Sequence, residues 1–274
     1  MTPFNKELWR GLISFRSLDS YPVLPCPYCN SSSLRVDEAH LIFRDLQWSS
    51  QNKVIHRDFN TKTKEVAAIF EDNKFFGAIA GLGMLQDFVH TTPSKFVGFF
   101  VCDQCGQDVA VAGTAKRFSG QGVSNRSPML KVEYFSPPVP MFAIHQSTPQ
   151  SIIEELVQAF SHFHSDLTAS GAKIRRAMER VCESLGCKEK TLHASIKVMA
   201  KEYPKEASWL SILKLVGNEA THSDRVEEAD LLASFAVMAA VLDIFRRRAM
   251  DAAIEQMLPA IEEKFTQLEG PKEA

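Results

Sequence analysis

The sequence predicts an α+β protein in two parts: a β-rich N-terminal zinc-ribbon module with a long insertion, and an all-α C-terminal helical bundle. Two Cys-x-x-Cys pairs lie among short runs of Phe, Val and Ile that Gly, Pro, Asn and Asp interrupt, which is typical of strands and turns. From about residue 148 the apolar residues recur at helical spacing instead. This change of period predicts two domains, residues 1–140 and residues 148–268.

Length and charge limit the classes of protein that this chain can belong to. At 274 residues and 45% hydrophobic, it can fill more than one core. The formal net charge is only −2, so no overall field steers the protein toward nucleic acid or an anionic membrane. Any contact with nucleic acid must come from a local patch.

The N-terminal segment MTPFNKELWRGLISF lacks the basic and long apolar regions of a signal peptide. The longest apolar run, residues 231–245, is too short for a bilayer core of about 30 Å, and Asp243 interrupts it. We therefore expect a cytoplasmic protein with no membrane partner. In a reducing compartment its six cysteines are metal ligands or buried thiols rather than disulfides.

The elements of the first part follow from local patterns. Apolar spacing predicts an amphipathic helix over residues 5–15. Several strands are expected between residues 34 and 111, with one short helix near residues 75–89. Residues 117–129 have the composition of an exposed loop, LKVEYF is a strand candidate, and the prolines within residues 137–147 predict an extended connector.

The second part begins with a strong helix start, in which Thr148 and Pro149 precede Ile152, Leu156 and Phe160 at helical spacing. Gly186, Pro204 and a polar HSDR segment separate the helices that follow. These are expected over residues 171–185, 190–201, 205–221 and 226–267.

The two cysteine pairs, Cys26/Cys29 and Cys102/Cys105, have the spacing of metal-binding knuckles. In such a knuckle two thiolates point at one metal ion, and two knuckles together supply the tetrahedral four-thiolate shell that structural zinc prefers. Gly106 supports the tight turn of the second knuckle. The sequence therefore predicts a structural Zn²⁺ held by these four residues.

This prediction carries a structural requirement, because residues 30–101 separate the two pairs. The insertion must fold and return the second knuckle to the first, and KFVGFFVC with QDVAVAG forms a hairpin candidate around the second knuckle. Redox activity is disfavoured, since no thioredoxin-like βαβ pattern accompanies the pairs. Catalytic zinc is disfavoured because four thiolates leave no open position. Cys182 and Cys187 are interpreted as buried thiols.

Polar residues interrupt the apolar period of two predicted helices, in residues 173–180 and residues 214–222. Asn218 and His222 are four residues apart and share one helix face. If the two helices pack together, both residues can meet an arginine and Glu179. Such a cluster is either a buried network that fixes helix register or a nucleotide or RNA site.

The segments KIRRAMERVCESLG and LKLVGNEATH, within residues 148–245, resemble the domain of unknown function 4145. Its hallmarks are an Arg-rich helix ending in Glu and a following Gly-Asn-x-x-x-His motif. The Cys-Pro-x-Cys, FFVCDQCG and EYFSPPVPMF segments also resemble N-terminal portions of longer members, so the resemblance covers most of the chain. It implies a helical bundle similar to the HEPN (higher eukaryotes and prokaryotes nucleotide-binding) domains, and an association with prokaryotic restriction or phage defence.

Three functions remain open. The first is a zinc-containing adaptor that binds nucleic acid (RNA or DNA) or a defence-system protein and forms a homodimer through the helical domain. The second, implied by the HEPN resemblance, is a metal-independent ribonuclease: His222 is the general acid or base, Arg176 or Lys214 stabilises phosphate charge, and Asn218 positions the substrate near Glu179. The chain departs from the ribonuclease pattern, because the nearest upstream basic residue is Lys214, farther from His222 than the family's arginine. The third is a structural scaffold.

Overall fold

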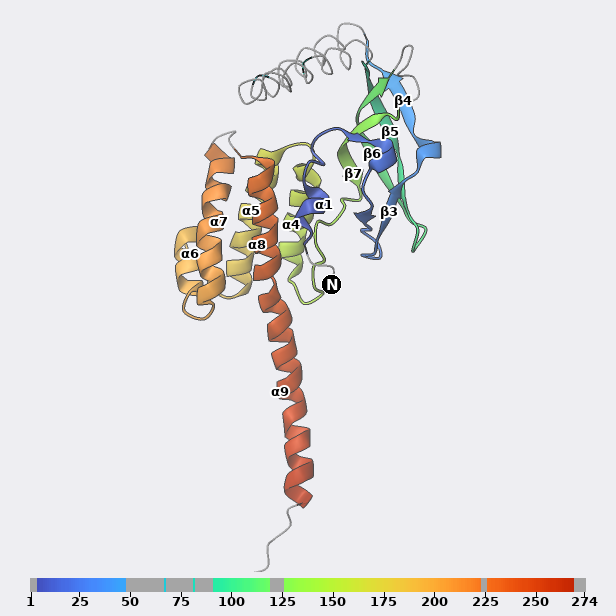
Figure 1. The fold of residues 1–274 in the computed structure, drawn as a ribbon. Helices are drawn as coiled ribbons and strands as arrows, with labels where there is room; N and C mark the ends of the chain where they lie inside the picture. The colour runs from blue at the N-terminus through green and yellow to red at the C-terminus, as the bar shows by residue number, and fades with distance from the viewer. Residues whose placement is uncertain are drawn as a thin grey trace, which may run out of the picture. The chain divides into compact units, whose positions relative to one another are not determined.

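The computed structural model describes residues 4–47, 91–118, 126–222 and 226–268, together with the single positions 67 and 81. It has the mixed α and β composition that the sequence predicts, with an antiparallel sheet in the N-terminal half and helices in the C-terminal half (Figure 1). Apart from residue 81, which is helical, the expected helix near residues 75–89 lies outside the described residues, as do residues 119–125 of the expected loop.

The chain forms two compact units, each described here by itself. The first, called the β unit, consists of Glu7–Pro140 and Phe160–Asp166. The second, called the helical unit, consists of Met1–Lys6, Met141–Ala159 and Leu167–Ala274.

The β unit holds a single antiparallel sheet with strand order β1-β7-β6-β5-β3-β2, and β4 pairs with β5 off this path. One edge of β5 is shared: β3 pairs with residues 100–102 and β4 with residues 94–97. The strands are β1 (Arg16–Ser17), β2 (Leu24–Pro25), β3 (Ser32–Val36), β4 (Ile42–Asp45), β5 (Thr91–Cys102), β6 (Asp108–Phe118) and β7 (Met129–Ser136).

The predicted hairpin around the second knuckle is present, because β5 and β6 pair from Thr91↔Phe118 to Val101↔Asp108. Alternate residues of β5 face opposite sides of the sheet, so Phe96 and Phe100 are buried while Val97 and Phe99 are exposed. The rings of Phe96 and Phe100 belong to the core of the unit. The largest side chains of that core are Trp9, Leu12, Leu24, Leu34, Phe96, Phe100, Leu130, Phe160 and Phe163.

The N-terminal helix is shorter than the sequence predicts. It covers Lys6–Trp9 (α1) rather than residues 5–15, and Gly11 follows with φ = +75°. A left-handed glycine ends a helix because it reverses the direction of the chain. With this turn, both Trp9 and Leu12 lie in the core. An unbroken helix with the same apolar spacing would bury both residues as well, so the spacing alone does not show where the helix ends.

The helical unit places helices where the sequence predicts them, with one correction. The segment 226–267 is two helices rather than one, with a break at Leu242. The amide of Leu242 still bonds to Met238, but Asp243 starts a new helix and accepts a hydrogen bond from Arg246 at 2.6 Å. The helices are α4 (Gln150–Phe163), α5 (Leu167–Ser184), α6 (Leu192–Met199), α7 (Pro204–His222), α8 (Glu228–Val241) and α9 (Asp243–Leu268).

Helix α5 is the centre of this unit, because it packs against α6, α7 and α8. Its buried face carries Ile174, Ala177, Met178 and Val181 at helical spacing. The opposing helices bury large apolar side chains, namely Ile196, Met199, Leu210, Leu213, Leu231, Phe235 and Met238. Among the described residues, no helix has the length and apolar character needed to cross a membrane.

His164 is the unusual member of the β unit's core. Its ring lies among Trp9, Phe135 and Phe163, with centroid separations of 6.1, 4.9 and 5.3 Å. Neither ring nitrogen has a hydrogen-bond partner among the described residues. Burial lowers the pKa of His164 to about 4, because the charged imidazolium would lose its hydration there.

We predict that His164 makes the β unit sensitive to acid. The folded pKa lies below the ordinary value of 6.5, so below that pH the unfolded chain binds a proton that the folded chain excludes. The contribution of neutral His164 to the free energy of unfolding is complete above about pH 6.5, and about 3 kcal/mol of it is lost as the pH falls to about 4. His164→Leu should abolish this loss, and denaturant unfolding from pH 7 to pH 4 measures it.

Replacing the exposed His40 by Gln is the control, and its pH dependence should match that of the unmodified protein. If the free energy of unfolding fell equally with pH in His164→Leu and in the unmodified protein, that result would contradict the burial argument.

Candidate metal centre

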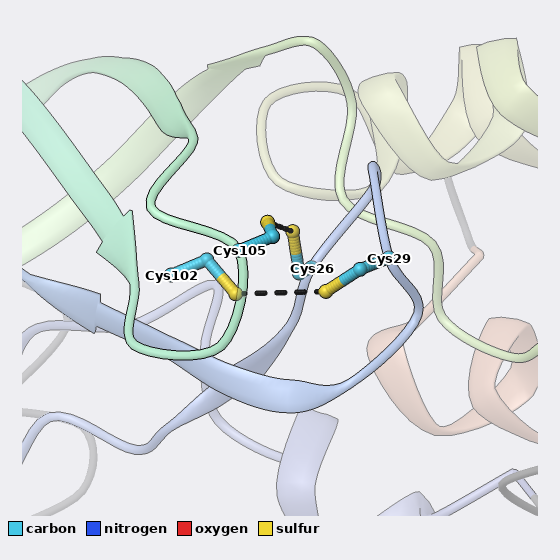
Figure 2. A group of neighbouring side chains, drawn as sticks. All are labelled: Cys26, Cys29, Cys102 and Cys105. Atoms are coloured by element: carbon cyan, nitrogen blue, oxygen red, sulfur yellow. Dashed lines mark hydrogen bonds between the residues drawn. The ribbon is translucent and has the colours of Figure 1, made fainter.

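The two knuckles occupy equivalent places at the ends of two hairpins. Cys26 and Cys29 lie between β2 and β3, whereas Cys102 is the last residue of β5 and Cys105 lies in the turn that leads to β6. Because β3 pairs with β5 with Leu34 opposite Cys102, the two turns come to the same end of the sheet. Figure 2 shows the four side chains directed toward one another from these two loops. The insertion between the two cysteine pairs thus brings the second knuckle back beside the first, as a shared metal site requires.

Both knuckles close with the same backbone hydrogen bond. The amide of Asn30 donates to the carbonyl of Cys26 at 2.9 Å, and the amide of Gly106 donates to that of Cys102 at 2.8 Å. Asn30 and Gly106 are also both left-handed, with φ of +57° and +70°. Asparagine and glycine are the residues that adopt this conformation at least cost, so each sequence fits its turn.

The four sulfur atoms lie within 4.8 Å of one another. Cys26 and Cys105 have their Sγ atoms 3.7 Å apart, and Cys29 and Cys102 have theirs 3.6 Å apart. A disulfide needs about 2.05 Å, whereas a tetrahedron of thiolates at about 2.3 Å from a zinc ion has edges of about 3.8 Å. All four residues are free cysteines, and their arrangement is compatible with one four-coordinate metal ion.

The electrostatics of the cluster favour a bound cation. Burial opposes ionisation of Cys102, but hydrogen bonds from Ser33 and Ser31 lower its pKa to about 5. Cys105 accepts a hydrogen bond from the amide of Gln107, yet desolvation and the neighbouring sulfurs raise its pKa to about 12. The four-cysteine cluster therefore loses its first proton easily and its last proton with difficulty, because neighbouring thiolates repel each other at this distance. A divalent ion removes that repulsion.

Cys182 and Cys187 are both buried in the helical unit and take no part in the cluster. Burial raises the pKa of Cys182 to about 12, so this thiol stays protonated. The sequence interpretation of these two residues as buried thiols is confirmed. The two serines beside Cys102 were not singled out from the sequence, although their alternate spacing, Ser31 and Ser33, was a usable signal.

The polar residues of the helical unit fall into separate groups. Asn218 on α7 accepts a hydrogen bond from the Nη1 atom of Arg175 on α5, and the Nε atom of Arg175 lies 3.6 Å from Glu179. Gly217 permits this approach, because a Cβ atom there would lie 3.0 Å from the Cβ of Arg175. The arginine that reaches Asn218 is thus Arg175, which its position four residues before Glu179 could have indicated.

The other predicted basic residues point elsewhere. Arg176 pairs at 2.9 Å with Glu155, a buried carboxylate of α4, and Lys214 lies 3.3 Å from the Nδ1 atom of His193. His222 is the last residue of α7, and its side chain lies outside the described part of the chain. Within the described residues, therefore, Asn218 and Glu179 share Arg175, while Arg176 and Lys214 lie apart from them.

Comparison with known families bears on this helical unit. Residues 157–269 match the family model described as Domain of unknown function (DUF4145). The match confirms the resemblance to this family for the helical part of the chain, and the family's description assigns no activity. Searches of curated proteins and of solved structures gave no significant match.

The left-handed turn of the second knuckle yields a test of the local backbone. Gly106→Asn should be as stable as the unmodified protein, because Asn30 already holds the same conformation in the first knuckle. Gly106→Val should lower stability by about 1–2 kcal/mol, since a branched side chain is strained at positive φ. No atom of the described residues lies within 4 Å of a Cβ added at Gly106, so backbone strain is the expected cause.

Thermal unfolding of the metal-loaded proteins measures this difference, with Asn30→Gly as the near-neutral control. Equal stability of the Asn and Val variants would contradict the assignment of strain.

We predict that the contact between Arg175 and Asn218 stabilises the packing of α5 against α7. Asn218→Ala and Arg175→Ala should each lower the free energy of unfolding by about 1–3 kcal/mol, because a hydrogen bond to a charged group is lost. The double variant should lose less than the sum, with a coupling of about 1 kcal/mol. Arg180→Ala, which removes an exposed pair with Glu183, is the control and should have little effect.

Proposed function

We propose that this protein is a zinc-containing binding adaptor, in which the cysteine cluster holds one structural Zn²⁺ through Cys26, Cys29, Cys102 and Cys105. The convergence of four sulfur atoms within 4.8 Å is the observation that carries the proposal. Four thiolates close the coordination shell of zinc, so no position is left for a reacting water. The free state of all six cysteines fits the reducing cytoplasm that we expect for it.

The role of the metal follows from the size of the strands around it. Strand β2 has two residues and β3 has five, so they bury little apolar surface at this end of the sheet. A metal ion that joins both knuckles supplies free energy that so small a core lacks. Zinc would therefore fix β2 and β3 against the β5–β6 hairpin rather than take part in a reaction.

The outer face of the sheet offers a surface for a partner. Ile42, Val97 and Tyr134 belong to one row across β4, β5, β6 and β7, because Ile42 and Ala112 pair with Val97 and Tyr134 pairs with Ala112. Paired residues in antiparallel strands share one face. These three side chains are 66%, 51% and 58% exposed, and Phe99 lies two residues from Val97 on the same face. We call these four residues the sheet patch.

The charges near this patch favour a protein over nucleic acid. Lys95 bonds to Thr114 and Glu133, and Arg35 bonds to Asp103 at 2.7 Å. Cations that are already paired with carboxylates attract phosphate weakly, whereas an apolar centre with a mixed charged rim suits a protein surface. A defence-system protein is the partner that the family resemblance suggests, and RNA or DNA is the alternative.

The ribonuclease alternative has less support in the helical unit. Arg176 and Lys214 contact Glu155 and His193 instead of the helix face that carries Asn218. The contact of Arg175 with Asn218 and Glu179 is explained by helix packing. We therefore propose a structural role for this cluster, and RNA cleavage in EDTA that His222→Ala abolishes would support catalysis instead.

The metal assignment predicts one zinc ion per chain in protein purified without added metal, measured by elemental analysis. Cys102→Ser and Cys26→Ser should lose the ion and lower the melting temperature of the β unit, because three thiolates bind less tightly than four. Cys182→Ser is the matched control and should keep the ion, since this thiol is buried in the other unit. A metal-free, fully folded native protein would contradict the proposal.

The binding role is tested separately on the zinc-loaded protein. Anisotropy with labelled RNA and DNA, and crosslinking in the source cells, would measure nucleic-acid and protein partners. Val97→Glu combined with Tyr134→Glu should reduce crosslinking to a protein partner several-fold, while an exposed change in the helical unit, Gln256→Glu, should not. Binding to nucleic acid alone would move the proposal to that class of partner.

A further inference from the structure

Helix α9 carries an apolar face that nothing in the described part of the chain covers. Every residue from Arg246 to Phe265 is exposed, and the helix extends beyond the label of α8 as an isolated rod in Figure 1. Six large apolar side chains lie on it, each 45–58% exposed. They are Met250, Ile254, Met257, Leu258, Ile261 and Phe265, here called the α9 stripe.

The α9 stripe has the spacing of a helix–helix seam. Met250, Ile254, Met257 and Ile261 follow one another at intervals of four, three and four residues, and Leu258 and Phe265 flank that line. At 3.6 residues per turn, all six fall within an arc of about 100°. Six half-exposed side chains of this size leave about 500 Å² of contiguous apolar surface, which monomeric proteins seldom expose.

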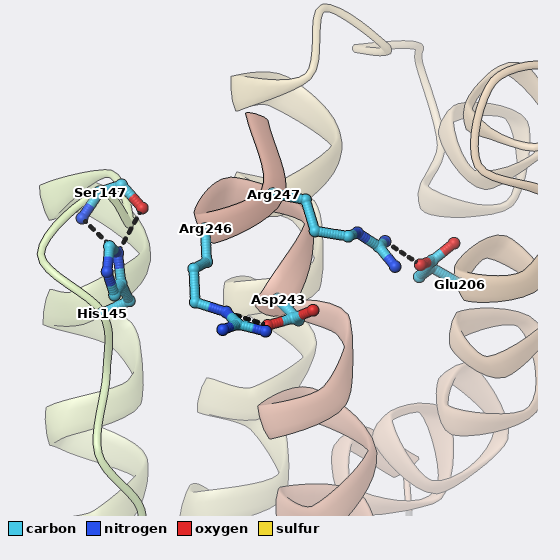
Figure 3. Close-up of polar contacts among 6 residues, drawn as sticks. All are labelled: His145, Ser147, Glu206, Asp243, Arg246 and Arg247. Carbon is cyan, nitrogen blue, oxygen red and sulfur yellow. Dashed lines mark hydrogen bonds and ion pairs between the residues drawn. The ribbon is translucent and has the colours of Figure 1, made fainter. Parts of the chain in front are cut away.

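The base of the helix is fixed to its bundle, so the stripe is held outward. Figure 3 shows Arg247 of α9 directed at Glu206 of α7, a carboxylate that is only 5% exposed, and the two form an ion pair. Arg246 bonds to Asp243 at 2.6 Å on the same turn. The three consecutive arginines at residues 246–248 therefore have two of their side chains in ion pairs within the protein.

We propose that the α9 stripe binds the α9 stripe of a second copy of this chain, with the two helices antiparallel. The residues are complementary to themselves in that orientation. With Met257 opposite Leu258, Ile254 comes opposite Ile261 and Met250 opposite Phe265, so each layer joins two apolar side chains. This register matches all six members of the stripe.

Asp251 and Lys264 flank the stripe about 140° apart around the helix, so both charges stay outside the seam. Antiparallel helices place the two bundles at opposite ends, whereas parallel helices would force both bundles to one end, and this favours the antiparallel orientation.

Pro259 is compatible with this arrangement. It lies half a turn away from the middle of the stripe, on the outer face of α9. Its ring displaces the carbonyl of Glu255 and lengthens the outer face, so any curvature that it introduces is toward the stripe and the partner helix.

The test measures the mass of the full zinc-loaded chain by light scattering after gel filtration, over about 1–100 µM. The 30.7 kDa chain should reach twice its mass as concentration rises. Ile254→Glu combined with Ile261→Glu should keep it monomeric over this range, a loss of at least about a hundredfold in affinity. Ala252→Glu combined with Gln256→Glu adds the same charge to the other face of α9 and should leave the dimer intact.

Circular dichroism checks that each variant keeps its helices. A native monomer at every concentration, or a dimer that the stripe variant leaves unchanged, would overturn the proposal. So would a stripe that is covered only by a different protein.

Orientation is tested by oxidative crosslinking of cysteines placed in the stripe and mapped by mass spectrometry. Chains with Met250→Cys mixed with chains with Phe265→Cys should crosslink between these positions, because the antiparallel register places them opposite each other, and Met250→Cys alone should not crosslink to its own copy. A crosslink between two copies of Met250→Cys would indicate parallel helices and overturn the antiparallel arrangement.

Discussion

The pairing of β3 with β5 is the interaction on which the β unit depends. It places Leu34 opposite Cys102 and thereby brings two knuckles, far apart in the sequence, to one end of the sheet. The thiols that meet there repel one another once they ionise, so the same pairing that unites them creates a need for a cation. The sheet thus gathers the sulfurs, and the metal ion that we propose would in turn fix the short strands.

The helical unit is held by different means. Its core is apolar around α5, and the contact between Arg175 and Asn218 lies where α5 and α7 come close together. Gly217 lets α7 approach α5 closely, and Arg175 of α5 then reaches Asn218 of α7 across this contact. Asn218 and Glu179 thus share one partner, Arg175, within the helical unit.

Much of this organisation could be predicted from the sequence. The cysteine spacing identified the cluster, the glycine after the second pair identified its turn, and apolar periodicity identified the helices of the second part. The failures have a shared cause. The end of α1 at Gly11 and the break at Leu242 leave the local apolar period nearly unchanged, because the residues on both sides are buried in the same core.

The sequence by itself determined which residues can bind a metal and where helical and extended segments lie, because both depend on spacing along the chain. Only the tertiary structure decided that Arg175, rather than Arg176, meets Asn218, that His164 lies among aromatic rings with its pKa lowered, and that no described residue covers the apolar face of α9. Each of these depends on which elements pack together and at what distance, and residues far apart in the chain set that distance.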